Sequence, residues 1–280
     1  MQLVCTKRLP RRGSLDHSIP YFPQYAQRAA AGYPCFFSRC CRCQPEALHG
    51  KSCAFIIRAE QPKREGKAGA EAEDRENFIL LLAELRAAMD SAFGPGRKSL
   101  TACASGAPDT LARQDWAGAA QYLDLINLMT YDLCGCWAGV SGHASSAEQA
   151  KKAVQCMLAQ GVAPGTICIG SPFYCTAMRL REKPERPTWD TLAQEDLLEL
   201  LQTPGWHSAY DARAGGAYLV YDGPDNPFDR WFLSVETARS LGQKLDLIRN
   251  AELAGIIVWE ASLDTKNHSF AAQLRDTLLR

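Results

Sequence analysis

Two apolar segments of the sequence end in aromatic and carboxylate side chains that could bind a polar ligand. One segment ends at Tyr131 and Asp132, and the other ends at Trp259 and Glu260. A flat aromatic beside carboxylates suits a sugar ring, because the aromatic face stacks on the ring and the carboxylate oxygens accept bonds from its hydroxyls. The structural alternative is that Asp132 caps a following helix, as aspartates after strands often do.

Four apolar strands, each alternating with helices, are expected to position these chain ends. The strands are expected at 100–104, 125–131, 166–170 and 256–259, and the helices at 78–93, 115–122, 146–160, 234–252 and 269–279. Near-continuous apolar strands that alternate with helices are typical of parallel βαβ units. The carboxyl ends of such strands carry the chemistry in α/β folds.

The segment 176–232 is too long to be a crossover between two of these units. It contains a helix pattern at 192–201 and a strand pattern at 217–221. We therefore expect an inserted α+β subdomain at 176–232.

Residues 1–70 differ from the rest in both charge and cysteine content. They hold twelve Lys and Arg against four Asp and Glu, and six of the 12 cysteines. They show no sustained hydrophobic period, so we expect a basic, Cys-rich arm without regular structure or family resemblance. The cysteine spacing does not match that of a zinc site, so neither a metal nor a cofactor is expected.

The remaining residues exclude two classes of partner. Residues 71–280 hold 19 basic and 27 acidic side chains, which argues against nucleic-acid binding because phosphates require a basic surface. The uncharged stretch 153–178 is broken by glycines and prolines, so no membrane span is expected. Charges precede any apolar run at the N-terminus, so no secretory signal is expected in the sequence as written, and the localisation is left open.

Several motifs follow one another in residues 71–280. They are YLDLINLMTYD at Tyr122–Asp132 followed by Gly135–Ala144, GSPFY at Gly170–Tyr174, FLSVE at Phe232–Glu236, and GIIVWE at Gly255–Glu260. In this order they resemble the sixth, seventh and eighth barrel strands of glycoside hydrolase family 18, the chitinases. Glu73–Phe78 and the leucine-rich helix after it resemble the helix that follows the fourth strand of that family.

The resemblance implies an activity and a mechanism. Family 18 enzymes cleave β-1,4 links between N-acetylglucosamine units with retention, and the acetamido oxygen of the substrate is the nucleophile. A glutamate protonates the leaving oxygen. This glutamate ends the motif D-x-x-D-x-D-x-E on the fourth strand. Chitin or a chito-oligosaccharide would then be the partner, and the family is commonly extracellular.

The resemblance also implies six substrate-binding residues, which are Met129, Tyr131, Asp132, Trp137, Tyr174 and Trp259. Tyr131 would bond the acetamido group and Asp132 would hold the same sugar. Trp259 would form the floor under the ring, with Met129 packed beneath the sugar and Trp137 on the leaving-group side.

The acid motif is expected to be missing, so no catalytic residue is implied. Residues 1–70 contain one aspartate, Asp16. Asp132 must stay ionised for the acetamido side of the reaction, and strand alternation turns Glu260 away from the face of Trp259. The family-like part without its insertion has about 150 residues, against ~250 for a full barrel. We therefore expect an α/β fold, a partial TIM (β/α)8 barrel of about the last four βα units, whose front half was lost by truncation or a misread gene.

Three hypotheses follow. The chain is a chitinase-like hydrolase, incomplete and inactive as written, or a non-catalytic binder of chitin or chito-oligosaccharides, or a fragment that cannot fold because half a barrel exposes sheet edges. Hydrolysis of a fluorogenic chitobioside separates the first from the others. Binding to chitin beads, with thermal denaturation as control, separates the second from the third.

Overall fold

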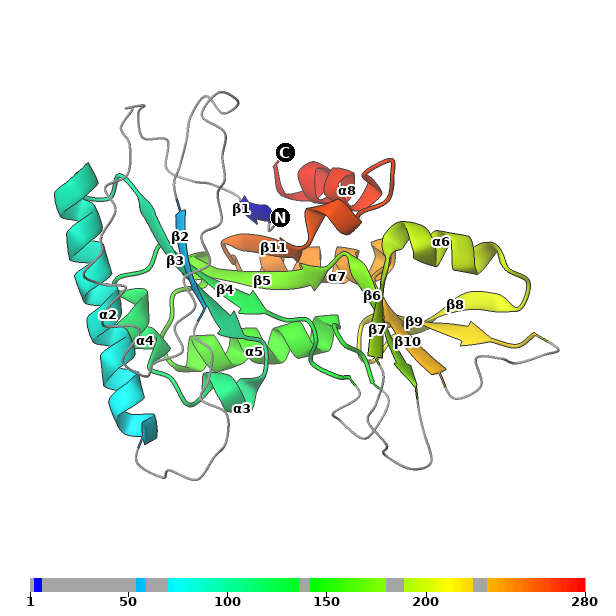
Figure 1. The fold of residues 1–280 in the computed structure, drawn as a ribbon, viewed down its shortest axis with the longest axis horizontal. Coiled ribbons are helices and arrows are strands. Elements are labelled where there is room, and N and C mark those ends of the chain that lie inside the picture. The colour runs from blue at the N-terminus through cyan, green and yellow to red at the C-terminus, as the bar shows by residue number, and fades with distance from the viewer. Residues whose placement is uncertain are drawn as a thin grey trace.

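The computed structural model describes residues 3–6, 54–58, 70–135, 142–179, 189–223 and 231–279. These residues form two sheets with helices packed around the larger one (Figure 1). The larger sheet has six strands in the order β1-β11-β5-β4-β3-β2, and the smaller has five in the order β7-β6-β10-β9-β8.

The larger sheet is mainly parallel, which confirms the α/β class. Its strands are β1 (Leu3–Thr6), β2 (Ala54–Arg58), β3 (Ser99–Ser105), β4 (Leu125–Met129), β5 (Ile167–Pro172) and β11 (Gly255–Trp259). All neighbours pair in parallel except β1, which is antiparallel to β11. The four predicted strands are β3, β4, β5 and β11. They lie in one sheet, and their bounds agree with the prediction to within two residues.

The expectation that residues 1–70 have no regular structure is wrong for β1 and β2. Both strands add to the edges of the parallel sheet, where β2 pairs with β3 from Ala54 opposite Ser99 to Arg58 opposite Cys103. A strand of four or five residues is too short to show a hydrophobic period. Its ladder partner supplies the hydrogen bonds that its own sequence does not reveal.

Helices cover one face of the larger sheet and bury its apolar residues. They are α2 (Ala70–Phe93), α3 (Pro108–Leu111), α4 (Trp116–Ala120), α5 (Ala147–Ala159), α7 (Ala238–Asn250) and α8 (Ser269–Leu278), with short 3-10 turns at Pro164–Thr166 and Ala261–Leu263. Leu82 of α2 and Met157 of α5 pack with Ile126 and Leu128 of β4 in this core. Successive strand residues face opposite sides, so Asn127 and Met129 lie on the face away from the helices.

Helix α7 begins later than the predicted 234–252. Ser234 lies in β10 (Trp231–Val235) and pairs with β6 and β9, so its backbone is extended. Thr237 is the N-cap, and its hydroxyl accepts a hydrogen bond from the Ser240 amide at 3.2 Å. Such a cap satisfies one of the amides that the first helical turn leaves without a partner.

The segment that was expected to be an insertion forms an antiparallel sheet with one helix. Its strands are β6 (Tyr174–Arg179), β7 (Trp189–Ala193), β8 (Trp206–Asp211), β9 (Gly216–Tyr221) and β10, and its helix is α6 (Gln194–Gln202). Cys175, Leu197, Trp206 and Leu233 form a separate small core. The sheet extends from Tyr174 to Val235, slightly beyond the expected 176–232.

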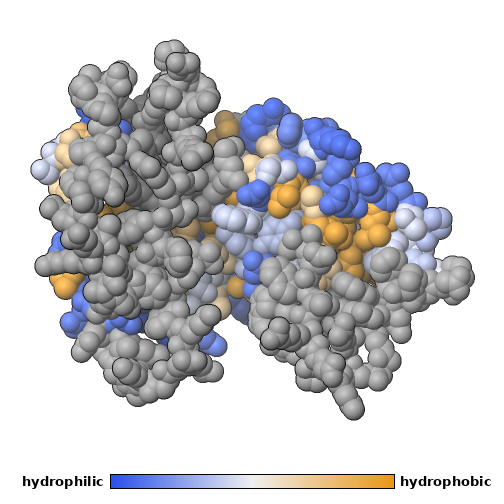
Figure 2. Space-filling model, viewed as in Figure 1, coloured by the Kyte–Doolittle hydropathy of each residue, from blue (hydrophilic) through white to orange (hydrophobic). Residues whose placement is uncertain are grey.

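In the described residues the larger sheet is open and does not close into a barrel, because its order ends at β1 and β2. Hydrophilic side chains gather over α8 and α6 in Figure 2, as expected for helices at a surface. No helix of the described part is long and apolar enough to span a membrane.

Candidate functional site

Tyr131 follows β4 and is held in place by contacts to β5. The Thr130 hydroxyl donates to the Gly170 carbonyl at 2.7 Å and accepts from the Gly170 amide at 2.8 Å. The tyrosine ring covers Gly170 so closely that a Cβ atom there would lie 2.7 Å from its Cε1 atom. Glycine is therefore required at this position of β5, because a side chain would displace Tyr131.

A hydrogen bond between Asp132 and Tyr174 joins the end of β4 to the start of β6. The Tyr174 hydroxyl donates to Asp132 Oδ1 at 2.7 Å, and Asp132 has a left-handed backbone with φ of 53°. Burial of the ring, together with the negative charge of Asp132, raises the pKa of Tyr174 well above its usual range. The phenol therefore stays protonated and remains a donor to Asp132.

Trp259 ends β11 and presents its ring to solvent. Its side chain is 47% exposed, while the preceding Ile256, Ile257 and Val258 are fully buried. The Phe173 amide donates to the Trp259 carbonyl at 2.9 Å, which ties the ends of β5 and β11 together. The Trp259–Glu260 peptide bond is cis. An exposed indole at the end of a buried strand is suited to stacking on a flat ligand.

The strand register brings these residues to one edge of the sheet. Trp259 pairs with Pro172 of β5, and Cys168 of β5 pairs with Asn127 of β4. Continued past the end of β4, this register brings Tyr131 level with Pro172 and Trp259. Val258 and Leu128 face the helical core. Alternation then places Trp259 and Met129 on the opposite face of the sheet.

One of the six expected ligand-binding residues cannot be placed, and Glu260, which was not among the six, has a partner of its own. Trp137 lies outside the described residues, so its predicted role stays a prediction. Glu260 accepts a hydrogen bond from the Ser262 hydroxyl in the turn that follows β11. Among the described residues, no group of His, Cys, Asp and Glu side chains could hold a metal ion. Most of the N-terminal cysteines lie outside the described part of the chain.

Comparison with known proteins identifies the family. The model of glycosyl hydrolases family 18 matches residues 56–264. The chain belongs to this family. The match begins inside the arm that was expected to have no family resemblance, at the third residue of β2.

Chitinases are among the relatives and the structural neighbours. Chitinase A1 of Niallia circulans is 29% identical over an alignment of 246 positions that covers 74% of this chain and 33% of that protein. The group IV chitinase of Ostrinia furnacalis has a TM-score of 0.67 at 23% identity, over 80% of this chain and 67% of that one. A class V chitinase from Nicotiana tobaccum, in complex with NAG4, has a TM-score of 0.66 at 20% identity over the same shares.

The chain spans between 33% and 50% of the length of the curated relatives it matches. At these identities the solved structures establish the fold alone. This chain shares the parallel sheet of that fold.

The position of β2 draws attention to Glu60, which the sequence analysis did not consider. As the parallel neighbour before β3, β2 has the place in the sheet where the family motif D-x-x-D-x-D-x-E is expected. If the glutamate of the motif is set at Glu60, the three aspartate positions are occupied by Cys53, Ile56 and Arg58. In this alignment the glutamate of the motif is present, but all three aspartates are replaced. Glu60 itself lies outside the described residues.

Proposed function

We propose that this chain is a chitinase-like protein that binds chito-oligosaccharides of N-acetylglucosamine at the ends of β4, β6 and β11. The supporting observation is the meeting of Trp259, Tyr131 and the Asp132–Tyr174 pair at one sheet edge. A family neighbour was solved in complex with NAG4, which agrees with this class of ligand.

Each side chain of the proposed site has a separate task. The exposed ring of Trp259 stacks on the apolar face of a sugar, and such stacking contributes about 1 kcal/mol beyond its buried area. Tyr131 donates to the acetamido group. Asp132 accepts from the same group, and its carboxylate is held in place by the hydrogen bond from Tyr174 to Oδ1.

We further propose that β2, β3, β4, β5 and β11 correspond to strands four to eight of a TIM barrel. The family match and the parallel order of these strands support this assignment. A barrel has eight parallel strands with a right-handed helical crossover between neighbours. The described sheet supplies five parallel strands, so the proposed site is the part of the family site carried by strands six to eight.

We expect this chain not to hydrolyse chitin at the rate of intact family enzymes. A positioned acid supplies about 10²–10⁴-fold in rate, and it must hold its proton near neutral pH. Neighbouring carboxylates raise the pKa of such an acid, whereas a neighbouring cation lowers it. In this sequence Ile56 and Arg58 stand where the family has the aspartates nearest the glutamate, so Glu60 lacks the residues that would keep it protonated.

Release of the fluorophore from a fluorogenic chitobioside tests this proposal. The wild-type chain and the variants Glu60→Gln and Glu260→Gln should all release it at the same low rate, while chitin beads retain the folded wild-type chain. Thermal denaturation of each sample controls for folding. Turnover near that of an intact family enzyme, abolished in Glu60→Gln, would show that the chain is an active hydrolase and that the missing aspartates are dispensable.

A further inference from the structure

We propose that the buried ion pair between Glu236 and Lys244 is a positioning device for the strand end that carries Tyr131 and Asp132. The pair acts through Ser145 and Thr130, so neither Glu236 nor Lys244 is placed here as a catalytic residue. The importance of this device for ligand binding rests on the proposed function, but its effect on Tyr131 and Asp132 does not.

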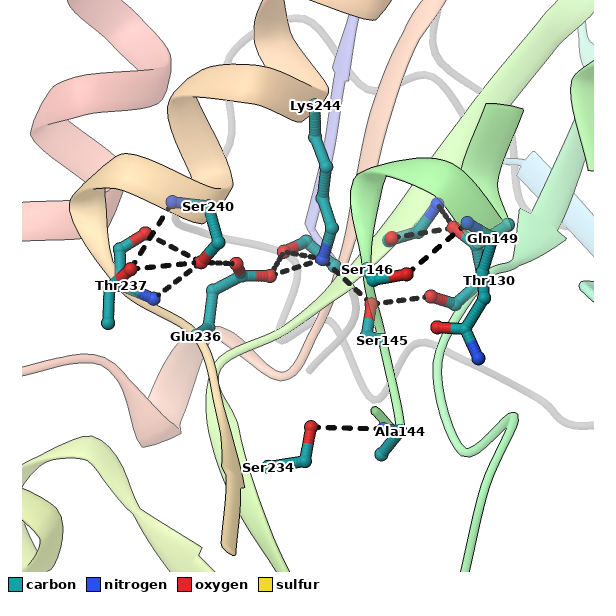
Figure 3. A network of polar contacts seen from close by, with 12 residues as sticks. Thr130, Ala144, Ser145, Ser146, Gln149, Ser234, Glu236, Thr237, Ser240 and Lys244 are labelled. Carbon is teal, nitrogen blue, oxygen red and sulfur yellow. Dashed lines mark hydrogen bonds and ion pairs between the residues drawn. The ribbon is translucent and has the colours of Figure 1, made fainter. Parts of the chain in front are cut away.

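The ion pair is completely enclosed, although both partners are charged. Lys244 in the middle of α7 has no exposed surface, and Glu236, which precedes the helix, is 3% exposed. The Lys244 ammonium donates to Glu236 Oε2, and the Ser171 hydroxyl donates to the same oxygen at 2.5 Å. The Ser240 hydroxyl donates to Oε1 at 2.5 Å. Both carboxylate oxygens are therefore bonded, as a buried charge requires (Figure 3).

The position of Lys244 in α7 is one where an apolar residue would be expected. Its neighbours at the same helix face are Leu241, Leu245 and Ile248, all buried in the main core. Replacing a buried ion pair by apolar residues of similar size is often neutral or stabilising. Stability alone therefore gives no reason for these charges, and a role in positioning gives one.

The charge of Lys244 determines the direction of the next hydrogen bond. An ammonium group has three protons and cannot accept. Besides Glu236, its partners are Ser145 Oγ at 2.7 Å and Ser171 Oγ at 3.5 Å. Because the Ser145 hydroxyl accepts from Lys244, its single proton is directed to the Thr130 carbonyl, 2.6 Å away. With a residue that cannot donate at position 244, this hydroxyl would be free to rotate.

Thr130 is then held at both ends, immediately before the proposed ligand-binding residues. Its carbonyl accepts from Ser145, and its side chain bonds both the amide and the carbonyl of Gly170. The carbonyl of Thr130 belongs to the peptide group that leads into Tyr131, so holding it restricts the direction in which Tyr131 leaves the strand. The network thus extends from α7 to the sheet edge.

The substitution Ser145→Ala tests the device, and Ser146→Ala is its matched control. Ser146 is the neighbouring buried serine, but its hydroxyl caps α5 by accepting from the Gln149 amide at 3.3 Å. We expect Ser145→Ala to weaken calorimetric binding of the N-acetylglucosamine tetramer by about tenfold, the size of one hydrogen bond. Ser146→Ala should lower the melting temperature but leave the affinity within about twofold of wild type.

Nuclear magnetic resonance provides a readout that a purely structural role would not move. The amide resonances of Tyr131 and Asp132 should shift in Ser145→Ala and not in Ser146→Ala, measured without ligand. If they shift but the wild-type chain binds no tetramer, the positioning device stands and the proposed function fails. If they do not shift in folded Ser145→Ala, the positioning device is overturned whatever the affinity.

A double variant tests whether Lys244 acts through Ser145. Glu236→Gln with Lys244→Met removes both charges, so no buried charge is left without a partner. We expect several-fold weaker binding of the tetramer, and when Ser145→Ala is added the total loss should not exceed the about tenfold loss of Ser145→Ala alone. The control variant is Glu195→Gln with Lys266→Met, a pair at the surface whose charged atoms lie 3.1 Å apart in the wild type. This variant should bind the tetramer as wild type does. Losses that multiply in the triple variant would show that Lys244 acts independently of Ser145.

Discussion

Tyr174 does not behave as an ordinary tyrosine, because its environment favours the neutral phenol. Its ring is 5% exposed and its hydroxyl bonds the Asp132 carboxylate. An ionised phenol would lose solvation and would face a second negative charge. Tyr174 is therefore a fixed donor, and its hydrogen bond holds the Asp132 carboxylate in place.

This environment predicts an unusual alkaline titration. Since the pKa of Tyr174 is raised far above the ordinary value of about 10, the folded chain keeps this proton at alkaline pH while the unfolded chain loses it. The resulting stabilisation is complete below pH ~10 and is lost as the pH rises further, so the free energy of unfolding should fall more steeply in wild type than in Tyr174→Phe.

Tyrosinate absorbance gives the direct check. Folded wild type and Tyr174→Phe should show equal absorbance up to pH ~11, although the chain has nine tyrosines and the variant has eight. Wild-type absorbance greater by one tyrosinate in this range would mean that Tyr174 ionises normally.

At the scale of elements, the long apolar strands and amphipathic helices could be predicted because their patterns repeat over many residues. Strand β4 and helix α5 are examples, and Ser146, where a helix was expected to begin, is the N-cap of α5. The short edge strands β1 and β2 could not be predicted, because their partners in the sheet decide their structure.

Parts of the candidate site could be predicted for a similar reason. Tyr131, Asp132 and Trp259 end apolar strands, so parallel pairing brings them to one edge. The hydrogen bond between Tyr174 and Asp132 depends on how the chain passes from β5 of the larger sheet into β6 of the smaller one. No local sequence pattern shows this passage. Lys244 did leave a signal, because it interrupts the apolar face formed by Leu241, Leu245 and Ile248.

The contact between β4 and β5 predicts a severe effect of Gly170→Ala. The added Cβ atom would lie 2.7 Å from both the Leu128 carbonyl oxygen and the Tyr131 ring, so a backbone group as well as a side chain would have to move. We expect a loss of about 1–3 kcal/mol in the free energy of unfolding and weaker binding of the tetramer. Gly165→Ala is the matched control, because its Cβ atom would meet nothing within 4 Å. Equal stability of the two variants, measured by denaturant unfolding, would refute the close contact.

At the scale of the whole molecule, the proposed function rests on two features, a strand edge that carries the proposed ligand-binding residues and a motif whose aspartates are replaced in the sequence. The parallel strands bring the proposed ligand-binding residues together without a closed barrel. The general acid requires a tuned carboxylate on the strand before β3, and the aspartates of the motif are absent from that part of the sequence. The proposed function therefore predicts that this chain binds a chito-oligosaccharide without hydrolysing it at the rate of intact family enzymes.

Calorimetric titration of the N-acetylglucosamine tetramer into the wild-type chain and into Trp259→Ala tests this account most directly. We predict saturable binding of one tetramer per chain, with the affinity reduced about five- to 150-fold in Trp259→Ala, because the sugar loses about 1–3 kcal/mol of stacking and burial. No binding by a folded wild-type chain, or equal affinity in the two proteins, would contradict the proposed site.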